Sequence, residues 1–180
     1  RNTQLFYDLA VNINSSLEIK EVMEILSTNV ARAFGVKGVS VRLLDRDNRT
    51  LELVASYGLS KKYLNKGPIN AEKSIAEALE GKAVVVRDAS KDRGVQYKKE
   101  KLEEGIASIL CVPIKEKEDV IGVLRLYSDV PRGFTEDEIK LATIIAHQGG
   151  LAIQNASMYL RLKEDIKDMK EDMWSHRSWF

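Results

Sequence analysis

The sequence predicts an α+β fold in which helices cover one face of a mostly antiparallel sheet. Apolar residues recur at helical spacing near both ends of the chain, whereas the middle contains paired runs that alternate with a period of two. The size agrees, because 180 residues with 44% hydrophobic side chains can bury one ordinary core but not two.

Two helices are predicted at the N-terminus. In the first, TQLFYDLAVNI, the residues Leu5, Leu9 and Ile13 lie four apart on one face. A polar break follows, and Ser16 is the expected cap of the second helix, LEIKEVMEILSTNVARAF. Gly35 is the residue at which we expect this helix to stop.

The middle of the chain is predicted to supply the sheet. The runs VSVRLLD and TLELVAS flank a polar turn and predict a β-hairpin. A second hairpin is predicted from ASILCVPI and DVIGVLRLYS, which the charged turn KEKED joins. A further strand is expected in AVVVRDA.

Two short helices are predicted between the hairpins. The run AEKSIAEALEG has Asn70 as its expected cap and Gly81 as its expected stop. The polar stretch from Asp88 to Gly105 lacks alternation, so we expect a loop followed by a short helix that Gly105 closes.

A long helix is predicted to begin directly after the last strand. Thr135 and Glu138 have the spacing of a capping box, and Phe134 and Ile139 that of a hydrophobic staple. The three consecutive acids from Glu136 also favour a helix N-terminus. If this helix runs unbroken to Met173, it is about 55 Å long at 1.5 Å per residue, and its second half must leave the body of the fold.

Two features of this helix predict close packing. Gly149 and Gly150 each cost about 1 kcal/mol relative to Ala inside a helix, so we expect the sheet or a partner helix to approach them. Beyond Asn155 a narrow apolar seam continues on an otherwise charged helix, which favours a coiled coil. The seam residues are Met158, Leu162, Ile166, Met169 and Met173. We favour a homodimer through the N- and C-terminal helices; the alternative is that this segment folds back on the first helix of its own chain.

Composition narrows the partners and the compartment. The chain has 28 Lys and Arg against 27 Asp and Glu, so no overall field favours nucleic acid, and a small ligand or a protein partner is expected. The single cysteine, Cys111, excludes an intramolecular disulfide framework and fits a reducing, cytoplasmic location. Because the chain begins with Arg1, we expect it to be part of a longer protein whose other domains, membrane segments included, lie outside this segment.

The ordered runs LEIKEVMEIL, GVSVRLLDRD, LELVASYGL, GKAVVVRDA, GIASILCVPI, VIGVLRLYS and PRGFTEDEIKLATIIAHQGGLAIQNA resemble the GAF domain, the ligand-sensing module of signalling proteins. The resemblance covers residues 16–156, with a dimerisation helix before it in 1–15 and a helical extension after it in 157–180. It implies a profilin/PAS-like fold with six antiparallel strands, a helical bundle on one face and a lidded ligand pocket on the other. The stretch from Asp88 to Gly105 would roof that pocket.

Alternation indicates which strand residues face the pocket. Ser40 and Arg42 share one face of their strand, and Arg125 and Tyr127 share one face of theirs, opposite Val41, Leu43, Leu124 and Leu126. If the apolar faces meet the long helices, the two arginines point to the pocket, where they could hold a carboxylate or phosphate. The alternative is that each pairs with an internal acid such as Asp88, Glu103 or Glu104. The candidate ligand-binding residues are Ser40, Arg42, Asp88, Tyr97, Arg125 and Tyr127.

No cofactor, metal site or catalytic motif is predicted. Some GAF relatives attach a tetrapyrrole to a cysteine, but the accompanying motifs are missing here, and Cys111 is expected to be a buried core residue. Asn65 and Lys66 resemble part of a cyclic-nucleotide motif without its spacing, so that assignment is not carried over. His147 and His176 are isolated, and no phosphate loop or nucleophile elbow is present.

Two functions therefore remain open. The first is a non-catalytic sensory module in which a small molecule shifts the terminal helices of a homodimer and so alters an attached signalling domain. The second is a structural dimerisation module whose own side chains fill the pocket. The aromatic tail, with Trp174, Trp179 and Phe180, is either a docking end or a frayed one.

Overall fold

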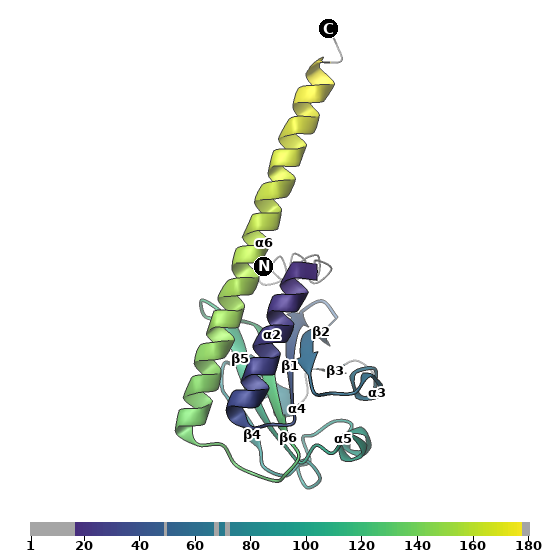
Figure 1. Ribbon diagram of the computed structural model, residues 1–180, viewed down its shortest axis with the longest axis vertical. Helices are drawn as coiled ribbons and strands as arrows, with labels where there is room; N and C mark the ends of the chain where they lie inside the picture. The colour runs from purple at the N-terminus through teal and green to yellow at the C-terminus, as the bar shows by residue number, and fades with distance from the viewer. Residues whose placement is uncertain (1–16, 49, 67–68, 71–72, 178–180) are drawn as a thin grey trace.

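The computed structural model describes residues 17–48, 50–66, 69–70 and 73–177. The predicted α+β class, with an antiparallel sheet and a long C-terminal helix, is confirmed (Figure 1). The predicted first helix over residues 3–13, the Ser16 cap and the tail residues Trp179 and Phe180 lie outside the described residues.

One sheet forms the centre of the molecule, in the order β3-β2-β1-β6-β5-β4 with every neighbouring pair antiparallel. Its five main strands come from the predicted runs, and a two-residue strand, β3, extends the β2 edge. The strand bounds are β1 Gly38–Asp45, β2 Thr50–Tyr57, β3 Ile69–Asn70, β4 Val84–Val86, β5 Ser108–Glu116 and β6 Asp119–Ser128.

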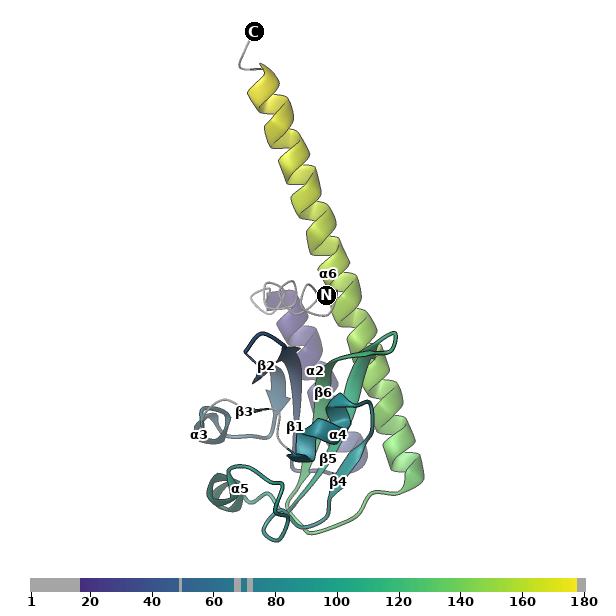
Figure 2. The ribbon, with the colours of Figure 1, turned by 180° about the vertical axis from the view of Figure 1, so that it is seen from behind.

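The helices lie on both faces of this sheet. Helix α2 (Leu17–Phe34) and helix α6 (Glu136–Arg177) pack side by side on one face (Figure 1). Helix α4 (Lys73–Leu79) lies on the opposite face, against β4, β5 and β6 (Figure 2). Two short helices, α3 (Lys61–Leu64) and α5 (Lys98–Glu104), contact each other near one end of that face. The reading of helices on one face only is therefore wrong, because α4 also covers the sheet.

The main core lies between the sheet and the two long helices, on the face where the apolar alternate residues of the strands lie. Alternate residues of β1 and β6 join the largest apolar cluster together with residues of α2 and α6. They are Val41, Leu43, Leu124 and Leu126. A separate cluster on the other face contains Leu44, Cys111 and Val123, packed with residues of α4. The opposite face therefore carries a smaller apolar cluster beside the buried polar side chains of Ser40, Arg42 and Arg125.

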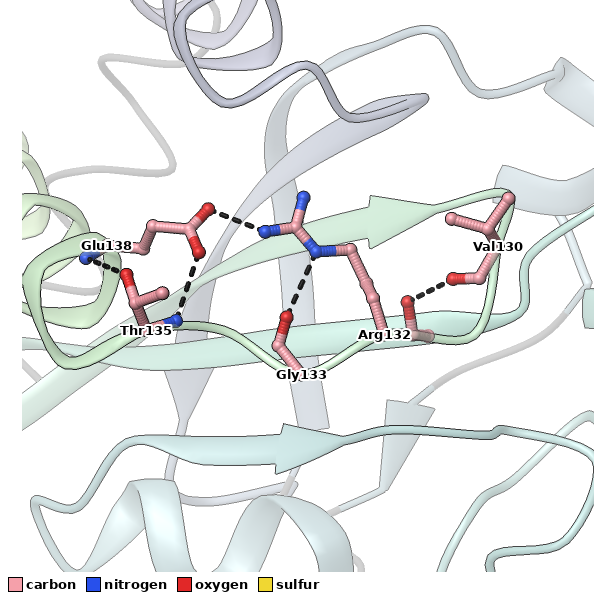
Figure 3. A network of polar contacts seen from close by, with 6 residues as sticks. Val130, Arg132, Gly133, Thr135 and Glu138 are labelled. Carbon is pink, nitrogen blue, oxygen red and sulfur yellow. Dashed lines mark hydrogen bonds and ion pairs between the residues drawn. The ribbon is translucent and has the colours of Figure 1, made fainter.

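The start of α6 follows the predicted capping box. The Thr135 amide donates to Glu138 Oε1 at 3.0 Å, and the Glu138 amide donates to Thr135 Oγ1 at 3.1 Å (Figure 3). Arg132 adds an ion pair to Glu138 at 2.6 Å and a bond from its Nε to the Gly133 carbonyl at 3.0 Å. The guanidinium also lies 4.3 Å above the ring of Phe134. The turn and the first turn of the helix thus form one polar network.

Helix α6 is 42 residues long and continues beyond the body of the fold, as predicted (Figure 1). At 1.5 Å per residue its length is about 63 Å. In its second half the seam residues Leu162, Ile166 and Met169 remain 59%, 46% and 65% exposed. Within the residues that the structure describes, no other segment of the chain covers them.

Gly149 and Gly150 show where the body of α6 is packed closely. A Cβ at Gly150 would lie 2.9 Å from Ile114 Cγ2 and 3.3 Å from the Lys115 carbonyl oxygen, whereas one at Gly149 would meet Leu26 at an ordinary 3.5 Å. The close approach predicted from these glycines is therefore confirmed for Gly150, and the neighbour is strand β5.

Candidate functional site

Strands β1 and β6 present their polar residues on the face opposite α2 and α6. Ser40 is paired with Arg125, and Arg42 is paired with Val123, so the two arginines are diagonal neighbours on one face. Tyr127 follows on the same side of β6. Both arginines lie on the face opposite the long helices, the side that the two-residue period of a strand predicts for them.

Tyr127 is the fixed centre of this face. Its side chain is fully buried, and its hydroxyl lies 3.1 Å from Ser40 Oγ. The ring of Tyr63, from α3, meets it edge to face with centroids 6.1 Å apart. The Arg125 guanidinium lies 5.3 Å from the centre of the Tyr127 ring. Ser40, Arg125 and Tyr127 therefore form one packed group with an aromatic residue that the sequence analysis did not single out.

Arg42 is a buried cation. Only 5% of its surface is exposed, and its Nη1 donates to the Leu51 carbonyl at 3.0 Å. Its Nε has no hydrogen-bond acceptor among the described residues. Burial lowers the pKa of Arg42, and repulsion from Arg125 lowers it further. An incompletely satisfied buried charge is costly, which makes Arg42 a candidate for contact with a group from outside the chain.

Residues near α3 and α5 bring two lysines over the same face. Lys66 lies 3.8 Å from the centre of the Tyr63 ring and donates to the Tyr63 carbonyl at 3.2 Å. The ammonium of Lys101 is 5.9 Å from the Tyr63 ring and 5.8 Å from the Tyr97 ring, and it donates to the Gln96 carbonyl. We call Arg42, Lys66, Lys101 and Arg125 the cationic cluster.

The charge of Lys66 is strongly affected by this setting. Burial lowers its pKa from 10.5 to about 7, assisted by repulsion from Arg42 and then from Arg125. Glu100 and Glu104 act in the opposite direction but more weakly. Lys66 therefore titrates near neutral pH while it faces the two arginines of the sheet.

The internal acids proposed as alternative arginine partners have other contacts. Asp88 accepts hydrogen bonds from the amide and hydroxyl of Ser90. Glu104 accepts from the amide and hydroxyl of Ser60, and Glu103 pairs with Lys62 at 3.6 Å. Among the described residues, no carboxylate forms an ion pair with Arg42 or Lys66. Of the six candidate residues, the structure brings together five and places the contacts of Asp88 elsewhere.

A small cavity lies between the sheet and these covering segments. Its free volume is about 10 Å³, roughly enough for one water molecule. Tyr97, Lys101, Cys111 and Arg125 line it together with apolar residues. Among the described residues, the buried polar atoms that lack a hydrogen-bond partner include Arg42 Nε, Tyr63 Oη and Gln96 Oε1. Two members of the cationic cluster, Lys101 and Arg125, therefore line a cavity with little free space, whereas Arg42 and Lys66 lie outside its lining.

Comparison with protein families assigns the fold. The family model described as the GAF domain matches residues 16–154, more than three quarters of the chain. The chain belongs to the GAF domain family. A search of the curated proteins found no match.

Solved structures agree with the GAF assignment. A domain attributed to a two-component sensor histidine kinase from Sinorhizobium meliloti 1021 is 27% identical, with a TM-score of 0.68 over 81% of this chain and 96% of that one. The GAF domain of an Acinetobacter phosphoenolpyruvate-protein phosphotransferase is 24% identical, with a TM-score of 0.63 over 84% and 92%. That of the Coxiella burnetii phosphoenolpyruvate-protein phosphotransferase is 18% identical, with a TM-score of 0.70 over 86% and 94%.

Three further features of this GAF domain concern its cysteine, its metal-ligating side chains and its helices. Cys111 is buried as predicted, and burial raises the pKa of its thiol to about 11. No group of three or more His, Cys, Asp or Glu side chains within the described part of the chain is placed to hold a metal ion. No helix in that part is both long and apolar enough to cross a bilayer.

Sequence reasoning missed the lysines and Tyr63 of this GAF domain. They come from SKKYLNKG and from the helix of Lys98–Glu104, where neither segment has enough turns to show periodicity. The available signal was composition, because SKKYLNKG combines cations, an aromatic ring and a Ser cap in eight residues. Ser60 does cap α3, accepting from the Tyr63 amide at 3.1 Å.

Proposed function

We propose that this GAF domain is a non-catalytic sensory module that binds a small anionic molecule at the cationic cluster. In this proposal α3, α5 and the segment between β4 and α5 act as a lid over β1 and β6. The presence or absence of the ligand is transmitted through α6 of a homodimer to a further domain of a larger signalling protein. That protein lies in the cytoplasm or is anchored to the membrane on the cytoplasmic side.

One observation carries the proposal. Arg42 and Lys66 approach the same site from the sheet and from the lid, and neither forms an ion pair with a carboxylate among the described residues. Like charges on two surfaces that close over each other oppose that closure. An anion between them would replace repulsion with charge-assisted hydrogen bonds and would hold the lid against the sheet.

The route to α6 is short. Strand β6 carries Arg125 and Tyr127, and it leads through residues 129–135 into the capped start of α6. This linker is attached to the lid side, because the Arg132 amide donates to the Arg87 carbonyl, just after β4, at 3.2 Å. A ligand that changes how the lid meets β6 would therefore act close to the residues that set the direction of α6.

The homodimer is proposed from the exposed apolar surface. On the body, α2 exposes Val22 and Ile25, and α6 exposes Leu141, Ile144 and Leu151. The same helix continues with the seam in its second half, on a segment that leaves the fold (Figure 1). A second copy that packs along α2 and α6 would bury these side chains, and exposed apolar patches mark such interaction sites.

The second candidate function, a dimerisation module without a ligand, is favoured by the small cavity. Its free volume of about 10 Å³ means that side chains already fill most of the site. Under this alternative no anion binds with a defined stoichiometry. Under the proposed function the lid must move outward to admit the ligand.

A titration with anions separates the two candidates. Phosphate, sulfate and small carboxylates are added at constant ionic strength, and saturable binding is followed by NMR shifts of lid amides. We expect saturation in the wild type and its loss in Arg42→Met. The matched control is Arg32→Met, an exposed position on α2 that changes net charge equally. Saturation that persists in Arg42→Met would contradict the assigned site, and its absence from the wild type would favour the second candidate.

A further inference from the structure

The projecting half of α6, residues 159–175, carries its exposed apolar side chains in a seven-residue repeat (Figure 1). The repeat consists of Leu162, Ile166, Met169 and Met173, at successive spacings of four, three and four, and all four side chains are exposed. This spacing places Leu162 and Met169 at the d positions of a coiled-coil heptad, and Ile166 and Met173 at the a positions. Tyr159, also exposed, occupies the preceding a position.

This repeat does not continue the exposed row on the body of the helix. There the exposed residues Ile144, Leu151 and Met158 recur every seven positions. The next two positions of that row hold Asp165 and Asp172. The change has the form of a four-residue insertion in the heptad pattern, which turns the apolar face by about 50° at 100° per residue. The projecting half therefore has an apolar face of its own, which begins after Met158.

Charged residues flank this face differently on its two sides. The e positions hold Lys163 and Lys170, and the g positions hold Asp165 and Asp172. All four side chains are exposed. Among the described residues, none of the four forms an ion pair within the chain. One flank of the apolar face is therefore positive and the other is negative.

These flanks are complementary to a second copy of the same helix in the parallel orientation. In a parallel pair each g position faces the e position five residues later on the partner helix, so Asp165 meets Lys170 of the second copy, twice by symmetry. In an antiparallel pair g faces g and e faces e, which brings like charges together. Ile166 at an a position and Leu162 at a d position also favour two strands. Exposed ion pairs add little affinity, so the apolar face supplies the affinity and the charges select the orientation.

We propose that residues 159–175 form a parallel, in-register, two-stranded coiled coil with the same residues of a second copy, in which Asp165 of each copy pairs with Lys170 of the other. This inference rests on the homodimer of the proposed function and adds the orientation, the register and the limits of the contact. The two domain bodies then lie at one end of the coiled coil, and the two ends of α6 lie together at the other.

Cysteine cross-linking of the full chain tests the orientation. Leu162→Cys and Met173→Cys alter positions eleven residues apart, about 16 Å along the helix. In the proposed coiled coil each position faces its own counterpart at a distance that a disulfide spans, so both variants should form covalent dimers under mild oxidation. An antiparallel pair brings at most one of them to its counterpart. The controls are Glu164→Cys, on the outer side of the helix, and the wild type, whose Cys111 is buried; neither should cross-link.

An exchange of charges tests the register. Asp165→Lys and Lys170→Asp should each raise the dissociation constant of the dimer by about fivefold or more at low ionic strength, because each replaces two attractions by two repulsions. The double variant restores opposite charges and should dissociate within about twofold of the wild-type constant. Glu164→Lys, which changes the charge as much on the outer side of the helix, should leave the constant at the wild-type value. Sedimentation equilibrium measures all four.

The outcomes distinguish this inference from the proposed function. Covalent dimers at both cysteine positions, together with rescue in the double charge variant, would support the parallel coiled coil. Cross-linking at one position only, or at neither in a wild type that light scattering shows to be a dimer, would overturn it while leaving a homodimer in place. A double charge variant that dimerises no better than the single variants would overturn the pairing of Asp165 with Lys170. A monomeric wild type would remove the homodimer from the proposed function as well, whereas the anion titration decides the ligand site separately.

Discussion

A single residue on β1, Arg42, contributes to the pKa of Lys66 on the lid. Arg42 is the largest neighbouring charge acting to lower the pKa of Lys66, after burial itself. Arg42→Met keeps an unbranched side chain of similar reach but removes the charge, so the pKa of Lys66 should rise from about 7 toward its ordinary range. The titration of the Lys66 side chain by NMR measures this. An unchanged titration would show that burial alone sets the pKa.

The same face shows what residue-level sequence reasoning could and could not predict. The two-residue period fixes the side on which Ser40, Arg42, Arg125 and Tyr127 lie, because a strand leaves no other choice. Lys66 and Lys101 could not be placed in the same way. Their positions depend on how non-periodic segments fold over the sheet, and this is determined by tertiary contacts such as the Lys66 ammonium on the Tyr63 ring.

Glu138 gives the fold a measurable response to acid. Hydrogen bonds from Thr135 and the ion pair with Arg132 lower its pKa below 4.5. Its folded-state pKa is therefore below the unfolded value, so the carboxylate stabilises the fold above about pH 4.5 and this contribution is lost as the pH falls through the folded pKa. Glu138→Gln should lower the free energy of unfolding by up to about 1 kcal/mol at pH 7.

The pH dependence of the unfolding free energy separates the contribution of the Glu138 charge from that of the Thr135 cap. The difference between wild type and Glu138→Gln should shrink as the pH falls below 4.5, because both side chains are then uncharged. Denaturant unfolding at several pH values measures it. A difference that stays constant down to pH 3 would mean that the charge of Glu138 contributes nothing. Thr135→Ala, which removes the other half of the box, should cost about 1 kcal/mol and vary less with pH, because it leaves Glu138 and its ion pair in place.

At the scale of elements, α6 packs closely against β5. Its two adjacent glycines provide a matched pair of substitutions. Gly149→Ala meets only an ordinary contact with Leu26, so the higher helix propensity of Ala should stabilise the fold by up to about 1 kcal/mol. Gly150→Ala meets Ile114 Cγ2 at 2.9 Å and should destabilise it by about 1–3 kcal/mol.

Thermal or denaturant unfolding of both variants measures whether Gly149→Ala stabilises and Gly150→Ala destabilises the fold. Equal effects of the two substitutions would show that α6 does not approach β5 more closely at Gly150. The sequence predicted a close contact here from the cost of two glycines in one helix. It could not say which glycine faces the sheet, because that depends on the rotation of α6, which the side chains of β5 and α2 fix.

At the scale of the whole molecule, the order and class of the main elements followed from periodicity and turn residues. The run LEIKEVMEILSTNVARAF forms α2 over its full length, and DVIGVLRLYS forms β6. The strand predicted from AVVVRDA is shorter, Val84–Val86, because only these residues pair with β5. The short elements α3 and β3 were missed, since four and two residues carry no period. The local sequence thus specifies the long elements, whereas tertiary contacts with neighbouring elements determine where the short covering segments lie.

The projecting half of α6 provides the last prediction. Leu162 and Met169 lie on its exposed seam, 59% and 65% exposed, and their burial between two copies is the source of stability expected for the proposed dimer. Replacing both by Glu places like charges across a two-fold axis, so the mass in solution should fall from that of a dimer to the 20.3 kDa of one chain. Light scattering coupled to size-exclusion chromatography measures this mass.

The control for this variant is Glu164→Ala together with Glu171→Ala, because both positions lie about half a turn from Leu162 on the charged side of the helix. This pair should leave the dimer intact. The domain should still fold in the Leu162→Glu, Met169→Glu variant, since neither side chain contacts the sheet. A cooperative unfolding transition of this variant would then show that it is a folded monomer. A wild type that is monomeric at high micromolar concentration would exclude the seam as the dimer contact, and signal transfer through paired α6 helices would have to be abandoned with it.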